Sequence, residues 1–331
     1  MLIVRPSTKL KKDKLSAADR VGSSAISRAS AADKYLFLSM SLHYRGRFAP
    51  SPTGPLHFGS LISALVSYLD ARHSGGQWLV RIEDIDPPRE IPGAADTILS
   101  QLDAHGLQWD DDVLYQSRRQ DAYLDVLADM RNQGILFPCR CTRQQLAAQG
   151  GVHRQPCRGS HEQLEEAHAL RVHVPTETMI TFDDLIQGRQ QQDVSSEVGD
   201  FVLLRKDMLP AYQLAVVVDD AFQDISHVIR GRDLLDSTAR QIYLQQRLGY
   251  STPQYGHHPL VLNRDGQKLS KQNLATAIDS AVAASNLQAA LKWLNMTLSE
   301  ELVGGSCEAI LSWAAINWNR EKLHCVSDRL K

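Results

Sequence analysis

Residues 47–60 read RFAPSPTGPLHFGS and lie between a strand pattern and a helix pattern. Before this stretch, residues 44–49 predict a short strand that ends at Pro50. After it, residues 61–69 repeat apolar side chains at helical spacing, so a helix is expected to start near Gly59 and Ser60 and to end at the glycines 75 and 76. Residues 78–82 then form an almost wholly apolar run, which is typical of a parallel strand buried on both faces. This βαβ unit predicts an α/β fold with a Rossmann-like parallel sheet.

The carboxyl ends of these two strands carry residues suited to a nucleotide site. Open α/β sheets bind ligands at that edge, and Glu83 and Asp84 follow the second strand directly. Gly59 at a helix start lets the backbone approach a phosphate, and free N–H groups and the helix dipole attract it. His57 can donate a hydrogen bond to the same anion, although a histidine there is also an ordinary helix cap.

A second cationic segment, residues 268–272, reads KLSKQ. Its two lysines form a loop that can neutralise the charge on departing pyrophosphate. Taken alone, such a loop is equally a solvated surface segment. Its occurrence roughly 210 residues after the anion-binding helix start makes the pair more informative than either part.

The rest of the chain predicts a catalytic domain interrupted by an insert. Helices are expected at residues 94–105, 118–133 and 234–248, the last closed by Gly249, and short capped helices at 142–145 and 160–163. Strands are expected at 200–205, 212–218, 227–230 and 259–262, with turns at 206–207 and 263–266. The resulting divisions are an extension at 1–40, the first half of the catalytic domain at 41–135, an insert with a metal cluster at 136–198, the second half at 199–265, and a lysine loop with a helical region at 266–331.

Three of the five cysteines cluster within the insert. Cys139 and Cys141 are two residues apart, so both thiolates can reach one Zn²⁺, and Cys157 follows. An odd, clustered count favours a reducing compartment and a metal site over a secreted disulfide framework. The alternatives are that the cysteines are idle, or that His161 completes the site.

Composition restricts the partners. The net charge is -2, so an RNA partner must bind a local basic face. No apolar run approaches the roughly 20 residues that span a bilayer. Residues 1–40 are rich in Lys, Ser and Ala and predict disorder. An organelle transit peptide, which the acidic residues in the arm disfavour, and a misassigned start with Met40 as the true first residue are the alternatives.

The two segments together resemble the paired signatures of class I aminoacyl-tRNA synthetases. The flanking motifs at residues 47–54, 81–84 and 228–235 are similar to the glutamyl branch, over about residues 45 to 275. The nearest likeness is to short members of that branch, which resemble the catalytic half of a glutamyl-tRNA synthetase without its anticodon-binding half.

The resemblance implies roles for individual residues. It makes His57, Lys268 and Lys271 catalytic, and it places ATP at His57, Gly59, Ser60 and Lys271. It also implies that His153, which stands where the family has a tyrosine, joins Cys139, Cys141 and Cys157 around one structural Zn²⁺. Around glutamate it implies Arg47, Phe48, Ala49, Pro50, Ser51, Glu83, Tyr212 and Arg230.

The same resemblance implies a ligase-type enzyme that forms glutamyl-adenylate from ATP, Mg²⁺ and L-glutamate without needing tRNA. Glutamate then passes to the queuosine base at the wobble position of tRNA(Asp). We expect a cytoplasmic monomer. Two alternatives stay open: a shortened but ordinary glutamyl-tRNA synthetase that charges a tRNA 3′ end, and a non-catalytic tRNA-binding paralogue. The intact His57, Glu83 and lysines disfavour the second, and the 60 residues after Lys271 disfavour the first.

Overall fold

The structure is a computed structural model, and it describes residues 44–148, 150–154, 167–263, 269, 276–323 and 329–330. The predictions for residues 1–40, for the helix at 160–163 and for most of the segments 263–266 and 268–272 lie outside these residues. Among the described residues, no helix is both long and apolar enough to cross a membrane.

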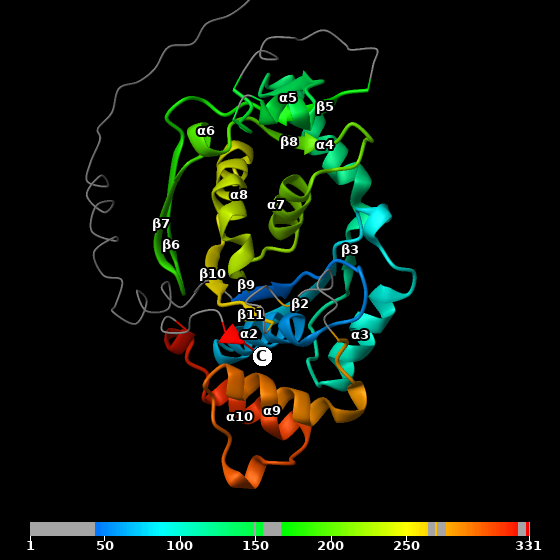
Figure 1. The fold of residues 1–331 in the computed structure, drawn as a ribbon, viewed down its shortest axis with the longest axis vertical. Coiled ribbons are helices and arrows are strands. Elements are labelled where there is room, and N and C mark those ends of the chain that lie inside the picture. Colours follow the sequence, from blue (N-terminus) through cyan, green and yellow to red (C-terminus); the bar gives the residue numbers. More distant parts are fainter. Residues whose placement is uncertain are drawn as a thin grey trace, which may run out of the picture. The chain divides into compact units, whose positions relative to one another are not determined.

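The predicted βαβ unit is confirmed and lies at the centre of the parallel strands (Figure 1). Strands β1 and β2 pair in parallel, with Arg47 opposite Leu79. On its other side β2 pairs with β3, also in parallel. A second parallel pair, β9 and β10, lies beside β1, where the Ser226 backbone N–H donates to the Arg45 carbonyl at 3.0 Å. The bounds are β1 Arg45–Phe48, α2 Phe58–His73, β2 Gln77–Ile82, β3 Leu114–Tyr115, β9 His227–Gly231 and β10 Gln254–His258.

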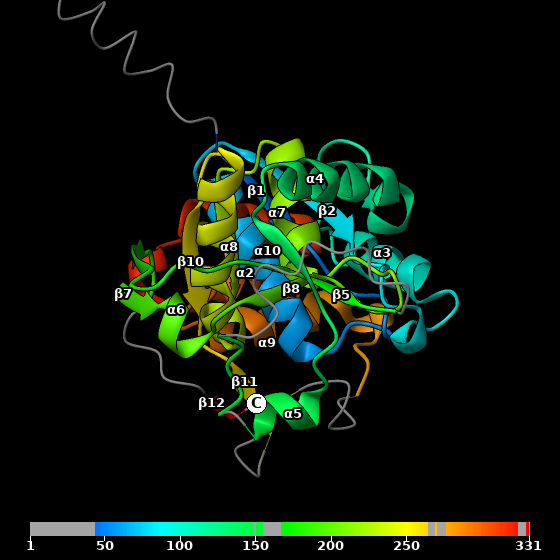
Figure 2. The same ribbon diagram turned by 90° about the horizontal axis from the view of Figure 1, so that it is seen from above.

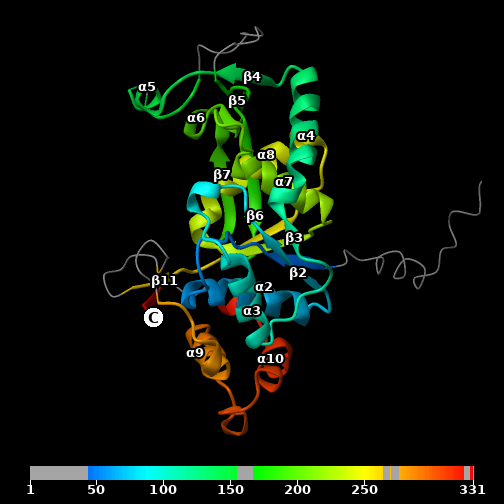
Figure 3. The ribbon, with the colours of Figure 1, turned by 90° about the vertical axis from the view of Figure 1, so that its right-hand side faces the viewer.

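Helices cover both faces of these strands (Figures 1 and 3). On one face α2 packs against α9 and α10, and its apolar stripe, including Ile62 and Leu65, is fully buried. On the other face α7 packs against α4 and α8, with Leu79 and Tyr123 in a second apolar core. Figure 2 looks through these layers, with α7 and α8 overlapping the blue α2. The bounds are α4 Gln120–Asn132, α7 Tyr212–Phe222, α8 Leu235–Leu248, α9 Ala283–Trp293 and α10 Cys307–Ile316.

The insert forms two small antiparallel sheets. In the first, β4, β5 and β8 lie in that order. Strand β8, which we expected to belong to the parallel part, pairs with β5 instead. The second is an unpredicted hairpin of β6 and β7, and the Leu185 N–H after β6 donates to the Tyr255 carbonyl of β10 at 2.8 Å. The bounds are β4 Leu136–Cys139, α5 Arg143–Ala147, β5 Ala169–Val172, β6 Met179–Asp184, β7 Gly188–Asp193, α6 Val194–Glu197 and β8 Phe201–Leu204.

The strand predicted at residues 212–218 is wrong, because this segment is helix α7. Residues 214–218 are all buried, since α7 is enclosed by α4, α8 and the sheet. Burial on every side removes the polar stripe that marks a helix, and three consecutive valines favour a strand.

The remaining predictions differ mainly at element ends. The helix near 94–105 is α3, Ala94–Ala104, and the Gly249 cap of α8 has the left-handed φ of 69°. The strand at 259–262 is reduced to β11, Val261–Leu262, which pairs with β12, Arg329–Leu330. Short 3₁₀ helices occupy Pro87–Arg89, Gln116–Arg119, Arg232–Leu234, Ser280–Val282, Glu300–Leu302 and Arg320–Leu323.

Candidate active site and metal centre

A cavity of about 580 Å³ opens at the carboxyl ends of β1 and β9 and at the amino end of α2. Its wall contains every residue predicted to contact glutamate, together with the predicted phosphate-binding helix start. The predicted residues that line it are Arg47, Phe48, Ala49, Pro50, Ser51, His57, Gly59, Ser60, Glu83, Tyr212 and Arg230. Segments that are up to 183 residues apart in sequence (Arg47 to Arg230) therefore meet in one cavity.

The amino end of α2 presents an ordered donor to the cavity. His57 caps the helix, because its Nδ1 accepts from the Ser60 N–H at 3.2 Å while the Ser60 hydroxyl accepts from the His57 N–H at 2.8 Å. An Nδ1 that accepts leaves the proton of a neutral imidazole on Nε2, which makes Nε2 a donor. The capping role and the anion-binding role of His57 are therefore compatible.

The lysine loop lies beside this helix start as far as the structure describes it. Leu269 lines the cavity, and its N–H donates to the Val261 carbonyl at 2.7 Å. A Cβ added at Gly59 would lie 3.2 Å from the Leu269 carbonyl oxygen and 3.2 Å from the His57 ring. Glycine at this position thus keeps the gap between helix and loop open. Lys268 and Lys271 lie outside the described residues.

Four buried charged groups contact one another at the cavity wall: Arg47 and Glu83 line the cavity, and Arg81 and Asp220 lie behind them. The Arg47 guanidinium donates to both carboxylate oxygens of Asp220, at 3.1 and 3.4 Å. Arg81 contacts the same carboxylate at 2.7 Å and Glu83 at 3.6 Å. Burial by itself would raise the pKa of Asp220, but the two arginines hold it below its usual value. Asp220 therefore stays ionised and fixes the plane of the Arg47 guanidinium.

Glu83 differs from Asp220 although both are buried. Burial raises its pKa to about 7, and Arg81 and Arg47 offset only part of that effect. With a pKa of about 7 this carboxyl group is only partly ionised in the empty site at neutral pH, and a cationic partner would favour its ionised form. Glu83 is therefore suited to bind an ammonium group.

Tyr212 and Arg230 complete the wall. Burial raises the pKa of Tyr212, so its hydroxyl stays protonated and can donate. Arg230 is 5% exposed, and its Nη1 has no hydrogen-bond partner among the described residues. A buried guanidinium nitrogen at a cavity wall is costly unless a ligand supplies an acceptor. Arg230 is thus placed to bind a carboxylate.

The sequence predictions missed the residues behind the wall, namely Arg81, Asp184, Asp220 and His257. Arg81 belongs to the motif at residues 81–84, but the sequence predicted no role of its own for it. Two signals could have identified Asp220 and His257: the acidic pair at 219–220 that closes an apolar run, and the two histidines at 257–258 before Pro259. Ionisable residues next to buried runs are expected to have partners.

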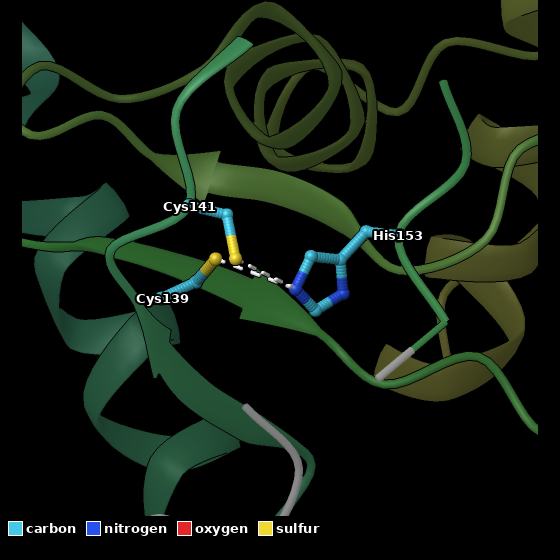
Figure 4. Close-up of side chains that lie close together, drawn as sticks. All are labelled: Cys139, Cys141 and His153. Carbon is cyan, nitrogen blue, oxygen red and sulfur yellow. Dashed lines mark hydrogen bonds between the residues drawn. The ribbon is translucent and has the colours of Figure 1, made fainter. Parts of the chain in front are cut away.

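The insert brings Cys139, Cys141 and His153 together (Figure 4). Their ligand atoms lie within 4.8 Å of one another, with His153 Nε2 at 3.4 Å from the Cys139 sulfur and 3.8 Å from the Cys141 sulfur. On the other side of the ring, Nδ1 lies 3.1 Å from the Asp200 carboxylate, the usual support for a metal-binding histidine. Cys157 and His161 lie outside the described residues.

The surroundings of Cys139 suit a thiolate. Burial alone would raise its pKa, but hydrogen bonds from the Cys141 backbone and from Arg171, at 3.2 Å, lower it. Two sulfur ligands and one imidazole with an oriented second nitrogen are the donor set that Zn²⁺ prefers. The described residues therefore fit three of the four ligands of a structural zinc site.

Comparison with known proteins identifies the family. The family model described as tRNA synthetases class I (E and Q), catalytic domain, matches residues 43–292. The chain is 50% identical over 288 residues to a glutamyl-Q tRNA(Asp) synthetase of Dechloromonas aromatica (strain RCB), covering 84% of this chain and 95% of the relative. It is 50% identical over 291 residues to the protein of the same name in Burkholderia cenocepacia (strain HI2424), covering 85% and 98%.

A solved structure shares the fold. It is a glutamate tRNA ligase of Elizabethkingia meningosepticum CCUG26117 in complex with its amino acid, with a TM-score of 0.69 and 27% identity over 88% of this chain and 67% of that one. The family match, the two relatives and this shared fold all indicate the same family. The chain therefore belongs to the family of class I tRNA synthetase catalytic domains of the glutamyl and glutaminyl type.

Proposed function

We propose that this chain activates glutamate with ATP and transfers it to queuosine at the wobble position of tRNA(Asp). The observation that carries the proposal is the single cavity in which Arg47, Glu83 and Arg230 surround a space next to the amino end of α2. The names of the similar curated proteins support the choice of acceptor.

The glutamate subsite matches a zwitterion with two carboxylates. Arg47 and Arg230 offer guanidinium groups at the cavity wall, and their remaining N–H donors can bind the carboxylates. Glu83 takes the ammonium, and Tyr212 adds a hydroxyl donor. Phe48, Ala49, Pro50 and Ser51 form the adjoining wall at the end of β1.

Adenylate formation requires ATP beside glutamate, and the amino end of α2 offers the phosphates a place in the same cavity. The glutamate α-carboxylate oxygen attacks the α-phosphorus of ATP, a new O–P bond forms, and the bond to pyrophosphate breaks. His57 and Gly59 bind the phosphates through the imidazole Nε2–H and the backbone N–H of the helix start, and Ser60 holds the His57 ring in place through its own N–H. Lys268 and Lys271 neutralise the pyrophosphate. Mg²⁺ bound to ATP supplies further charge neutralisation. A ring hydroxyl of queuosine then attacks the activated carbonyl, and AMP leaves.

We also propose that Cys139, Cys141, His153 and Cys157 bind one structural Zn²⁺. The enzyme would act as a monomer in the cytoplasm, where a reducing environment keeps these thiols available. Sedimentation of the purified protein at working concentration tests the monomer.

The test of the acceptor uses labelled glutamate, ATP and four tRNA(Asp) preparations. These carry or lack queuosine, and each has an intact or trimmed 3′-terminal adenosine. Trimming is preferred to periodate, since periodate also oxidises the ring diol of queuosine. We expect label on both queuosine-containing tRNAs and on neither of the others. If labelling requires the terminal adenosine and does not depend on queuosine, the protein is an ordinary glutamyl-tRNA synthetase. If the protein catalyses no glutamate-dependent pyrophosphate exchange, it is non-catalytic.

A further inference from the structure

Arg230 is held from behind mainly by two side chains that do not line the cavity, those of His257 and Thr238. Its Nε donates to Nε2 of His257 at 3.0 Å. Its Nη2 donates to the Thr238 hydroxyl at 2.8 Å and to the Leu234 carbonyl at 3.3 Å. Three of the five N–H donors are thereby occupied, and the remaining two, on Nη1, are left for the cavity.

His257 is in turn held by a carboxylate. Its Nδ1 lies 2.5 Å from Oδ2 of Asp184. Both side chains are fully buried. The other oxygen of Asp184 accepts backbone N–H groups of Ile186, Gln187 and His257 at 2.8 to 3.1 Å. An acidic group that accepts four hydrogen bonds is strongly favoured in its ionised form.

The protonation states follow from these contacts. Burial lowers the pKa of His257, and its neighbour Arg230 opposes a positive charge on the ring. Burial alone would raise the pKa of Asp184, but the hydrogen bonds from His257, Gln187 and Ile186 lower it. A neutral His257 next to an ionised Asp184 carries its proton on Nδ1, so Nε2 has a free lone pair. That lone pair accepts from Arg230.

We propose that Asp184 and His257 are positioning residues that orient Arg230 for the substrate carboxylate. Asp184 selects the His257 tautomer, and His257 fixes the plane of the guanidinium so that Nη1 points into the cavity. Asp184 ends β6, so the insert hairpin takes part in substrate binding at a distance from the reacting atoms. The inference rests on the proposed function for the identity of the carboxylate as part of glutamate.

Three substitutions separate orientation from general damage. Asp184→Asn keeps an oxygen that accepts from the backbone N–H groups, but it presents an amide N–H to Nδ1 of His257. The imidazole proton must then move to Nε2, which can no longer accept the hydrogen bond from Arg230. His257→Asn keeps the donor to Asp184 and loses the acceptor for Arg230. His257→Gln keeps an oxygen near the Nε2 position and restores that acceptor. Gln187→Leu is the matched control, because it removes only a hydrogen bond from the same hairpin to the His257 carbonyl, 2.7 Å long.

The rate of pyrophosphate exchange is measured at varied glutamate concentration and then at varied ATP concentration, which gives a KM for each substrate. We expect Asp184→Asn and His257→Asn to raise the glutamate KM about 10-fold or more, the effect of losing one hydrogen bond to a charged group, with the ATP KM within about twofold. The glutamate KM of His257→Gln should be close to that of the parent protein. The glutamate KM of Gln187→Leu should equal the parent value. Unchanged glutamate KM in both Asn variants, or an equal rise in the two KM values, would overturn the proposal.

A measurement on the parent protein covers variants that fail to fold. Nitrogen-15 spectra of the histidine rings report which nitrogen carries the proton. We expect His257 to be neutral with its proton on Nδ1 at pH 7, and a proton on Nε2 would refute the chain of contacts. A parent that shows no glutamate-dependent exchange refutes the proposed function, whereas an active parent with unaffected variants refutes only this inference.

Discussion

At the scale of single residues, Glu83 shows how burial sets the chemistry of a group. Its side chain is 9% exposed and lies 3.6 Å from Arg81, yet its pKa is raised to about 7 because desolvation outweighs two nearby arginines. Asp220, in contact with the same arginines at shorter distances, stays ionised. The pKa values of the two carboxyl groups therefore differ because of the geometry of their contacts more than because of the identity of their partners.

The pH dependence of glutamate binding follows from Glu83. Only the carboxylate binds an ammonium, so the glutamate KM should rise as pH falls from 8 to 6, by roughly 5- to 10-fold for a pKa of about 7. Steady-state pyrophosphate exchange at each pH measures it, with the ATP KM as the internal control. A flat glutamate KM over this range would contradict a raised pKa at Glu83.

Stability should respond in the opposite sense. A carboxyl group whose folded pKa exceeds its ordinary value, 4.5, stabilises the fold below that value and loses this contribution as pH rises through about 7. The variant Glu83→Gln should therefore melt at a higher temperature than the parent at pH 8, without substrate. The difference should vanish near pH 4, where Glu83 is protonated in both states. Equal melting temperatures at pH 8 would argue against a destabilising carboxylate.

Lys271 belongs to the same scale. Its neighbour Leu269 lines the cavity, which supports a role for this loop in binding the phosphates. Lys271→Ala should slow pyrophosphate exchange by roughly 100-fold or more, as expected when one preorganised charge donor is lost, and should leave the glutamate KM little changed. Lys292→Ala, on the exposed side of α9, is the control. Exchange near the parent rate would exclude Lys271 from the reaction.

At the scale of elements, the insert depends on contacts between segments that are distant in sequence. Cys139 ends β4, His153 forms a bridge with Gly199, and Asp200 follows immediately. The Asp200 carboxylate joins His153 at 3.1 Å and the Val174 N–H at 2.9 Å. A metal at this point would fasten the edge of the β4–β5–β8 sheet.

Metal analysis tests this element. Purified protein should contain one zinc per chain, and His153→Ala or Cys139→Ser should lose it, because a structural site needs all four ligands. Asp200→Asn should weaken metal binding by about 10- to 100-fold without removing a ligand. Cys307→Ser, on α10, should keep full occupancy. If the ligand variants bind as much zinc as the parent protein, the metal is bound at another site.

At the scale of the whole catalytic unit, Asp70 joins three segments. It is 1% exposed on α2 and accepts from the Tyr44 hydroxyl at 2.5 Å, before β1, and from Trp318 Nε1 at 2.9 Å, after α10. Arg320 adds an ion pair at 3.0 Å. The C-terminal helices are thus attached to the βαβ unit through a buried carboxylate and through apolar packing.

Loss of this carboxylate should destabilise the unit. Asp70→Ala leaves a buried hydroxyl, an indole N–H and a guanidinium without their acceptor, so the free energy of unfolding should fall by about 3 to 5 kcal/mol. Asp103→Ala, an exposed position on α3, should change it by less than about 0.5 kcal/mol. Urea unfolding followed by circular dichroism measures both. A loss at Asp70 as small as that at Asp103 would show that apolar packing alone attaches the C-terminal helices.

The sequence by itself determined the βαβ unit and the front of the site. Local patterns specify these features, because helical spacing, the Gly249 cap and the motif at residues 47–60 act over a few neighbouring residues. Only the tertiary structure decided that residues 212–222 form a helix and that β8 pairs within the insert. It also decided that Asp220 contacts Arg47 and that Asp184 and His257 stand behind Arg230. Burial and long-range hydrogen bonds control these features. Asp184 and His257 are 73 residues apart, and no local periodicity records that a carboxylate will meet an imidazole once two strands pack together.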